Sequence, residues 1–187
     1  MTSVHVWAGA GCIGLHDFPR RVRLLDLPSS LRLNPYYKKQ AEKFTQYQDL
    51  VIHTSLRRLD YNFLRQISQT VLRDEQSIHF VAITENDVRN SNEYWLADSL
   101  EQICSSARLC KKTDIVLLDL IRVGKSHKNT RTRRQVRRVA ARFNDVSERI
   151  DAASQLRAEE LDEFCLTDAG AKLVIEIMAQ HLHVNAK

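Results

Sequence analysis

The stretch IHFVAITENDVRNSNEYWLADSLEQI, residues 78–103, changes from the pattern of a strand to that of a helix. Its first six residues form a short apolar run rich in β-branched and aromatic side chains, which is typical of a buried strand. From residue 92 onward, the apolar side chains recur at helical spacing. A buried strand followed by a helix is the repeating unit of α/β proteins, so this stretch predicts that class.

Three further apolar runs have the same character as residues 78–83, and segments with helical spacing follow them. The predicted strands are residues 4–8, 50–53, 78–83 and 115–120, and the predicted helices are residues 36–47, 60–73, 92–110, 130–150 and 167–181. Right-handed crossovers between such strands give a parallel sheet with helices on both faces. We therefore expect a three-layer α/β/α sandwich, whose ligand crevice lies beyond the carboxyl ends of the strands.

The composition limits the class of protein further. The chain has 187 residues, of which 43% are hydrophobic and 27% charged, close to an average globular domain. Five glycines and three prolines leave no glycine-rich phosphate loop and no linker. We expect a single domain over residues 1–187, in a soluble cytoplasmic protein without a membrane span. The four cysteines lack the spacing of a zinc knuckle, so neither a metal nor another cofactor is expected.

Basic residues are concentrated in one part of the chain. Residues 122–149 contain ten arginines and lysines but only two acidic residues, whereas residues 151–168 contain six acidic residues and one arginine. On a helix, Arg131, Arg134, Arg138 and Arg142 would project from neighbouring positions on one side. Like charges this close repel one another unless an anion binds, and a phosphate backbone is such an anion. A solvated helix face is the alternative.

A second basic set follows the first predicted strand. It comprises Arg20, Arg21, Arg23, Arg32, Lys38 and Lys39, with Tyr36 and Tyr37 alongside. Aromatic side chains beside arginines suit unpaired bases, which stack on them. Together the two sets predict a surface for single-stranded or loop regions of RNA. The candidate RNA-binding residues are Arg20, Arg21, Arg23, Lys38, Lys39, Lys125, Lys128, Arg131, Arg133, Arg134, Arg137 and Arg157.

Two short motifs resemble sequence blocks of the SGNH, or GDSL-type, hydrolases. Residues 84–87, TEND, follow a strand as the family's G-x-N-D block does, and Asn86 matches the asparagine that contributes to its oxyanion hole. Residues 162–170, DEFCLTDAG, resemble the last block, D-x-x-H followed by a helix start. With a first strand near the N-terminus, the resemblance covers nearly the whole chain and implies an SGNH hydrolase-like fold.

The chain departs from this family at the catalytic positions. The family has Gly-Asp-Ser after its first strand, whereas residues 9–12 read GAGC and contain no serine. Thr84 replaces the glycine of G-x-N-D, and Cys165 replaces the histidine of the last block. Without a nucleophile and a base, the remaining Asn86 cannot carry out two-step acyl transfer. The resemblance therefore implies a pseudoenzyme, with no catalytic residue.

Arg157 is the one basic residue within the acidic segment 151–168. In the SGNH family, this connection crosses the carboxyl-end rim of the sheet, which implies a place for Arg157 at the RNA surface. A surface ion pair with Glu159 or Glu160 is the alternative.

A degenerate SGNH-like domain with arginine-rich surfaces most resembles the C-terminal domains of the Oskar proteins of insects. That resemblance implies a non-enzymatic domain that binds mRNA in cytoplasmic germ granules, with further protein partners in those RNP granules. Two alternatives stay open. One is a divergent SGNH-type esterase, such as a retrotransposon-encoded esterase domain, acting through Cys12. The other is a protein-interaction scaffold whose basic surface meets acidic partners.

Overall fold

A computed structural model describes residues 3–12, 21–23, 49–54, 59–74, 76–90, 93–110, 112–122, 124–162 and 165–185. Its main sheet has the strand order β2-β3-β1-β4-β5-β6. The parallel strands are β1 (Ser3–Ala8), β3 (Asp49–Thr54), β4 (Gln76–Thr84), β5 (Lys112–Leu120) and β6 (Ser147–Asp151). The short strand β2 (Arg21–Arg23) pairs antiparallel with β3 at one edge.

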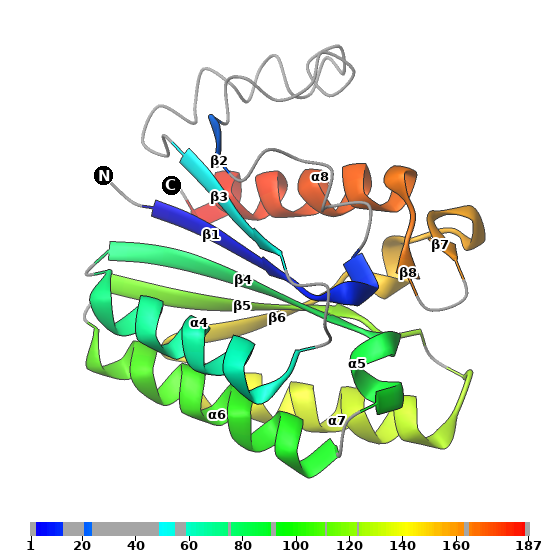
Figure 1. Cartoon of the computed structure of the whole chain (residues 1–187), viewed down its shortest axis with the longest axis horizontal. Helices are drawn as coiled ribbons and strands as arrows, with labels where there is room; N and C mark the ends of the chain where they lie inside the picture. The colour runs from blue at the N-terminus through cyan, green and yellow to red at the C-terminus, as the bar shows by residue number, and fades with distance from the viewer. Residues whose placement is uncertain are drawn as a thin grey trace.

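Helices cover both faces of this sheet, as Figure 1 shows. Helix α8 (Asp168–Asn185) lies on one face, and α4 (Tyr61–Arg73), α6 (Glu93–Leu109) and α7 (His127–Arg142) lie on the other. The predicted three-layer α/β/α sandwich is therefore confirmed. Within the described part of the chain, no helix is long and apolar enough to cross a membrane.

All four predicted strands are present, and β1, β4 and β5 are buried on both faces along most of their length. Successive side chains alternate between two cores, as the pleat of a strand requires. Phe80 and Val116 belong to the core under α8, whereas Val81 and Leu117 belong to the core under α4, α6 and α7. A strand between two cores reads as a continuous apolar run, which explains why the sequence marked these strands clearly.

The helices at 60–73, 92–110 and 167–181 are also confirmed, with clear start signals. Asp60 caps α4 by accepting the Phe63 N–H at 2.9 Å. Thr167 caps α8 by accepting the Gly170 N–H on its hydroxyl at 3.2 Å. A Cβ at Gly170 would lie 2.8 Å from the Leu166 side chain, so only glycine lets α8 start this close to its neighbours. The predicted helix at 36–47 lies outside the described residues.

The prediction of one helix over residues 130–150 was wrong. Helix α7 ends at Arg142, and β6 then extends the sheet beside β5. The sequence did not indicate this strand because β6 contains charged side chains, which are read as solvent-exposed although they have partners inside the protein. The remaining short elements are η1 (Ala10–Cys12), α5 (Glu85–Asn90), η4 (Ala153–Gln155), η5 (Ala158–Glu160), β7 (Leu161–Asp162) and β8 (Cys165–Leu166).

Candidate functional site

The ends of β1 and β4 meet where the resemblance places a catalytic serine. Gly11 lies in the turn η1 after β1, and Thr84 is the last residue of β4. A Cβ added at Gly11 would lie 2.7 Å from the Thr84 Cβ and closer still to its hydroxyl oxygen. Thr84 therefore fills the space into which a side chain at position 11 would project. Thr84 therefore excludes a serine at position 11, and the glycine at position 11 leaves the room that Thr84 occupies.

The Thr84 hydroxyl is held by Asp87 in the first turn of α5. The Thr84 N–H and its hydroxyl both donate to Asp87 Oδ2 at 2.8 Å, and the Leu59 N–H donates to Oδ1 at 2.8 Å. Thr84 and Asp87 are buried. The bond from the Thr84 N–H to the Asp87 carboxylate is one half of a capping box, and it helps to start helix α5 directly after β4. Asn86, which follows in that helix, is half-buried.

The cysteine alternative finds little support in the surroundings of Cys12. This residue is fully buried in η1, where its N–H donates to the Gly9 carbonyl at 2.9 Å. Burial also raises the pKa of the Cys104 thiol, to about 11, which disfavours a reactive thiolate there.

Asp162 and Cys165, from the last motif, oppose each other across the β7–β8 ladder. Their side chains lie outside the described part of the structure.

Three histidines stack in the core under α4. The rings of His5 and His79 are 4.6 Å apart, and the ring of His53 lies 3.8 Å from that of Trp7. The Trp7 Nε1–H donates to His79 Nδ1 at 3.1 Å. Burial lowers the pKa of His53 to about 4 and that of His79 to about 3, so both are neutral at pH 7. Among the described residues, no group of three or more side chains is arranged to hold a metal.

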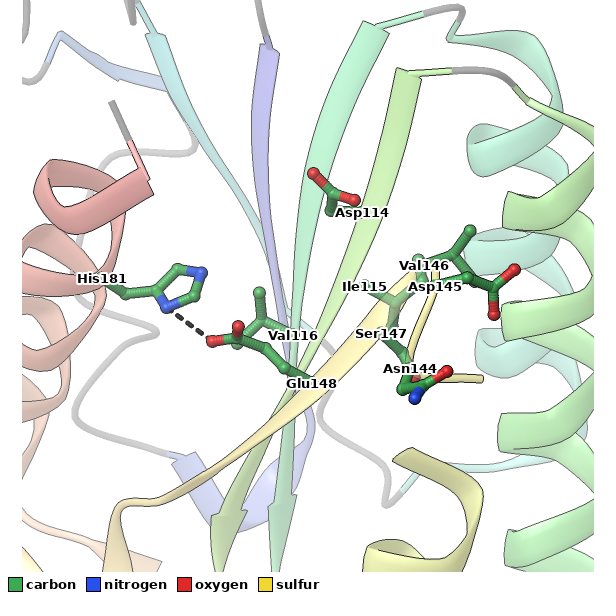
Figure 2. A pocket seen from close by; sticks show the side chains of 9 residues that line it. All are labelled: Asp114, Ile115, Val116, Asn144, Asp145, Val146, Ser147, Glu148 and His181. Atoms are coloured by element: carbon green, nitrogen blue, oxygen red, sulfur yellow. Dashed lines mark ion pairs between the residues drawn. The ribbon is translucent and has the colours of Figure 1, made fainter. Parts of the chain in front are cut away.

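A pocket of about 240 Å³ opens where β5 and β6 begin, at the end of the sheet opposite to Gly11 and Thr84. Figure 2 shows His181 of α8 and Glu148 of β6 pointing toward each other, with 2.7 Å between Nδ1 and Oε1. Burial, and then the charge of Glu148, raise the pKa of Asp114 nearby. None of the residues predicted from the sequence to bind RNA lines this pocket.

The outer surface of α7 brings together most of the basic residues predicted on it. We call this group the basic surface, and its exposed members are Lys125, Lys128, Arg131, Arg134, Arg137 and Arg138. The helix contains no acidic residue. Arg142, at its end, differs because its Nη1 pairs with Glu101 of α6 at 2.8 Å. Within the described part of the chain, no ion pair is found for Arg134, Arg137 or Arg138.

Three of the ten basic residues in 122–149 are used inside the protein. They are Arg122, Arg133 and Arg149. Arg133 is 8% exposed, and its Nε donates to Asp119 at 3.2 Å, while its Nη2 pairs with Asp151. Arg149 Nε donates to the same fully buried Asp119 at 2.8 Å. The prediction that Arg133 contacts RNA is therefore corrected, because Arg133 lies on the inner side of α7 and its charge is neutralised there.

The other candidate residues are not joined to the basic surface by any described contact. Arg20, Lys38 and Lys39 lie outside the described residues, and the same holds for the side chains of Arg21 and Arg23 in β2. Arg157 is exposed, and its backbone N–H donates to Glu160 Oε2 at 2.6 Å. Its guanidinium forms no ion pair within the described ranges, so its role in RNA binding stays a prediction.

Comparison with known proteins finds similarity in structure alone. The sequence matches no family model and no curated protein. The structure of TesA is 13% identical with a TM-score of 0.64, and the match covers 97% of this chain and 98% of TesA. A lipolytic protein of the G-D-S-L family from Veillonella parvula is 10% identical, with a TM-score of 0.61 and coverages of 98% and 99%. A protein from Agrobacterium tumefaciens assigned as an arylesterase is 11% identical, with a TM-score of 0.59 and coverages of 97% and 98%.

These similarities bear on the predicted lack of catalysis. The similar proteins carry the names of esterases and lipolytic proteins, so the comparison contradicts the prediction that the chain is not an enzyme. The comparison offers no support for RNA binding, for a germ-granule role or for a specific likeness to the Oskar domains. What the match over both full lengths shows is the fold, and the chain has that of the SGNH (GDSL-type) hydrolases.

Proposed function

We propose that the chain binds RNA through the basic surface of α7. One observation carries this proposal: six basic side chains are exposed on, or directly before, one helix that contains no acidic residue. Phosphates that contact such side chains release condensed counterions, which drives association. The fold leaves this surface free of the sheet, because the inner side of α7 is packed in the core through Val136 and Val139.

The spacing of the arginines supports an anionic ligand. Arg131, Arg134 and Arg138 follow one another at intervals of three and four residues, so their charges are neighbours on the helix surface. Like charges at this spacing destabilise a helix by roughly 0.2 to 0.5 kcal/mol per pair. A bound phosphate backbone removes this repulsion, whereas water and salt only screen it.

Charge reversal tests the proposal. The triple variant Arg134→Glu, Arg137→Glu, Arg138→Glu should bind RNA at least tenfold more weakly, and its slope of log K against log salt should fall by about one unit per lost contact. A matched control reverses three exposed charges elsewhere, with Arg65→Glu, Lys112→Glu and Lys172→Glu. The control has the same net charge and should retain most of the affinity. Equal losses in both variants, or no loss in either, would contradict a surface on α7.

A second proposal, hydrolysis of an ester at the carboxyl-end rim, is favoured by the fold likeness. The chain offers one hydroxyl in the space of the family's nucleophile, that of Thr84, with the Asp87 carboxylate 2.8 Å away. In this reaction, Asp87 accepts the hydroxyl proton as the Thr84 oxygen attacks the acyl carbon. The alkoxide leaves with that proton, and water then hydrolyses the acyl-threonine ester. Because Thr84 is only 3% exposed, small activated esters are the substrates to test first.

An assay with p-nitrophenyl acetate tests this second activity. Turnover should be lost in Thr84→Val, which removes the hydroxyl at nearly constant volume, and kept in Thr130→Val, which makes the same change on the surface of α7. The variant Cys12→Ala tests the thiol in the same assay. A wild-type chain without turnover above the buffer rate would refute ester hydrolysis.

A further inference from the structure

An exposed tyrosine lies on the helix that packs against α7. Tyr94, in the first turn of α6, is 64% exposed, although a side chain of this size is usually at least half covered. Its neighbours Leu96 and Leu100 are buried in the core and hold α6 on the sheet. The ring of Tyr94 is therefore presented to solvent by a firmly packed helix.

The contacts between α6 and α7 show which side of α6 carries Tyr94. The two helices lie side by side and run in the same direction, as Figure 1 shows. Glu101, in the middle of α6, pairs with Arg142 at the end of α7, and the Arg108 side chain, in the last turn of α6, donates to the Arg142 carbonyl at 2.9 Å. Tyr94 precedes Glu101 by seven residues, which puts both on the same face of the helix. Tyr94 thus lies along α7, two turns closer to the start of both helices.

The basic residues on the facing side of α7 follow from the same contacts. Arg131 precedes Arg142 by eleven residues, or three turns, so it shares the side of α7 that is turned toward α6. Lys128 is on that side too, and its Nζ donates to the Arg89 carbonyl at 3.3 Å, shortly before α6 begins. Tyr94, Lys128 and Arg131 therefore lie together where the two helices start.

We propose that Tyr94 stacks on an unpaired base while Lys128 and Arg131 contact the flanking phosphates. The basic surface then takes single-stranded RNA in preference to a double helix. In a duplex the bases are stacked on one another and present no free face, whereas single strands can splay a base onto an aromatic ring. This inference rests on the proposed RNA binding, and it adds the class of RNA that the surface selects.

Binding of two RNAs by four proteins tests the inference. The RNAs are a 12-nucleotide oligouridine and a duplex of the same length, and the proteins are the wild type, Tyr94→Ala, Tyr94→Phe and Tyr61→Ala. Tyr61 is the matched control, since it is 59% exposed on α4, away from the basic surface. For oligouridine, Tyr94→Ala should bind on the order of tenfold more weakly, whereas Tyr94→Phe and Tyr61→Ala should bind like the wild type. Duplex binding should be weaker and equal in all four.

The salt dependence of binding shows whether Tyr94 contributes by stacking or by charge. The binding results also show whether a failure concerns the stacking role alone or RNA binding as a whole. Tyr94→Ala should keep the wild-type salt slope, because no phosphate contact is lost. A wild type that binds neither RNA refutes the proposed function itself. A wild type that binds oligouridine, with Tyr94→Ala unchanged or with the duplex bound as tightly, overturns the stacking role and leaves RNA binding in place.

Discussion

Gly11 and Thr84 show how one contact decides which side chains two strand ends can hold. Adding a Cβ in Gly11→Ala overlaps Thr84, so this variant should lose about 1 to 3 kcal/mol of unfolding free energy. Thr84→Gly alone should also be destabilising, because the hydrogen bond that its hydroxyl donates to Asp87 is lost. The double variant should lose less than the sum of the two, since the glycine at 84 makes room for the new methyl group. Urea unfolding of the four proteins measures this coupling.

Gly124 provides the control for this cycle. It has a positive φ of 86° and no atom within 4 Å of an added Cβ, so alanine there causes backbone strain without overlap. Gly124→Ala and Thr84→Gly should therefore be additive. Additive losses for Gly11→Ala and Thr84→Gly would instead show that positions 11 and 84 do not compete for space.

Two adjacent arginines of α7 should differ sharply in their effect on stability. Arg133→Leu removes a partner of the fully buried Asp119, and breaking a buried ion pair in this way costs about 3 to 5 kcal/mol. Arg134→Leu changes an exposed side chain and should stay within about 0.5 kcal/mol of the wild type. Thermal or urea unfolding distinguishes the two variants. Equal unfolding free energies would show that the buried ion-pair network does not stabilise the protein.

At the scale of elements, the sequence was informative where a strand or helix follows from local pattern. β4 and β5 could be predicted because their side chains are apolar on both faces, and α8 because Thr167 and Gly170 mark its start. β6 could not, because Arg149 reads as a solvent-exposed charge. Its partner Asp119 is thirty residues away in the chain, and only the packed sheet brings the two together.

The candidate site was predictable in the same uneven way. The sequence marked Thr84 and the serine-free segment 9–12 as departures from the family, but it could not reveal that Thr84 and Gly11 compete for one space, which depends on how β1 and β4 end. The arginines of α7 were visible as a group, yet the burial of Arg133 depends on where the helix rests on the sheet. The position of Tyr94 beside α7 likewise follows from helix packing and has no signal in the sequence.

Three adjacent strands, β1, β3 and β4, each contribute a histidine to one stack, and this makes stability depend on pH. His79 is fully buried with its pKa lowered from 6.5 to about 3, so the unfolded chain takes up a proton more readily than the folded one. Its contribution is complete above pH 6.5 and is lost as the pH falls below that value. Between pH 7.5 and 5.5, His79 alone should cost about 1 kcal/mol of unfolding free energy.

Urea unfolding at these two values of pH measures this effect. His5 and His53 act in the same direction, because burial lowers their pKa values too. The variant His79→Gln removes one titrating group and should show a smaller difference between the two pH values. A wild type equally stable at both would mean that the histidines are not neutral and buried together.

On the scale of the whole molecule, the sheet separates the surface of the α7 layer from the surface of α8. The basic surface lies on the layer of α7, whereas α8 covers the opposite face of the sheet. Bound RNA should therefore protect Lys125 and Lys128 from acetylation, and should leave Lys112 at the start of β5 and Lys172 on α8 as reactive as before. Mass spectrometry of the modified peptides reads all four sites at once. Uniform protection would indicate that RNA coats the protein without a preferred surface.

The buried charges around Asp119 also impose an order on assembly during synthesis. Asp119 and Arg133 leave the ribosome before Arg149 and Asp151, which complete the network. A nascent chain that has exposed only α7 would bury Asp119 and Arg133 without their remaining partners, which is costly. We therefore expect that the helix carrying the basic surface docks on the sheet only after the last parallel strand has emerged.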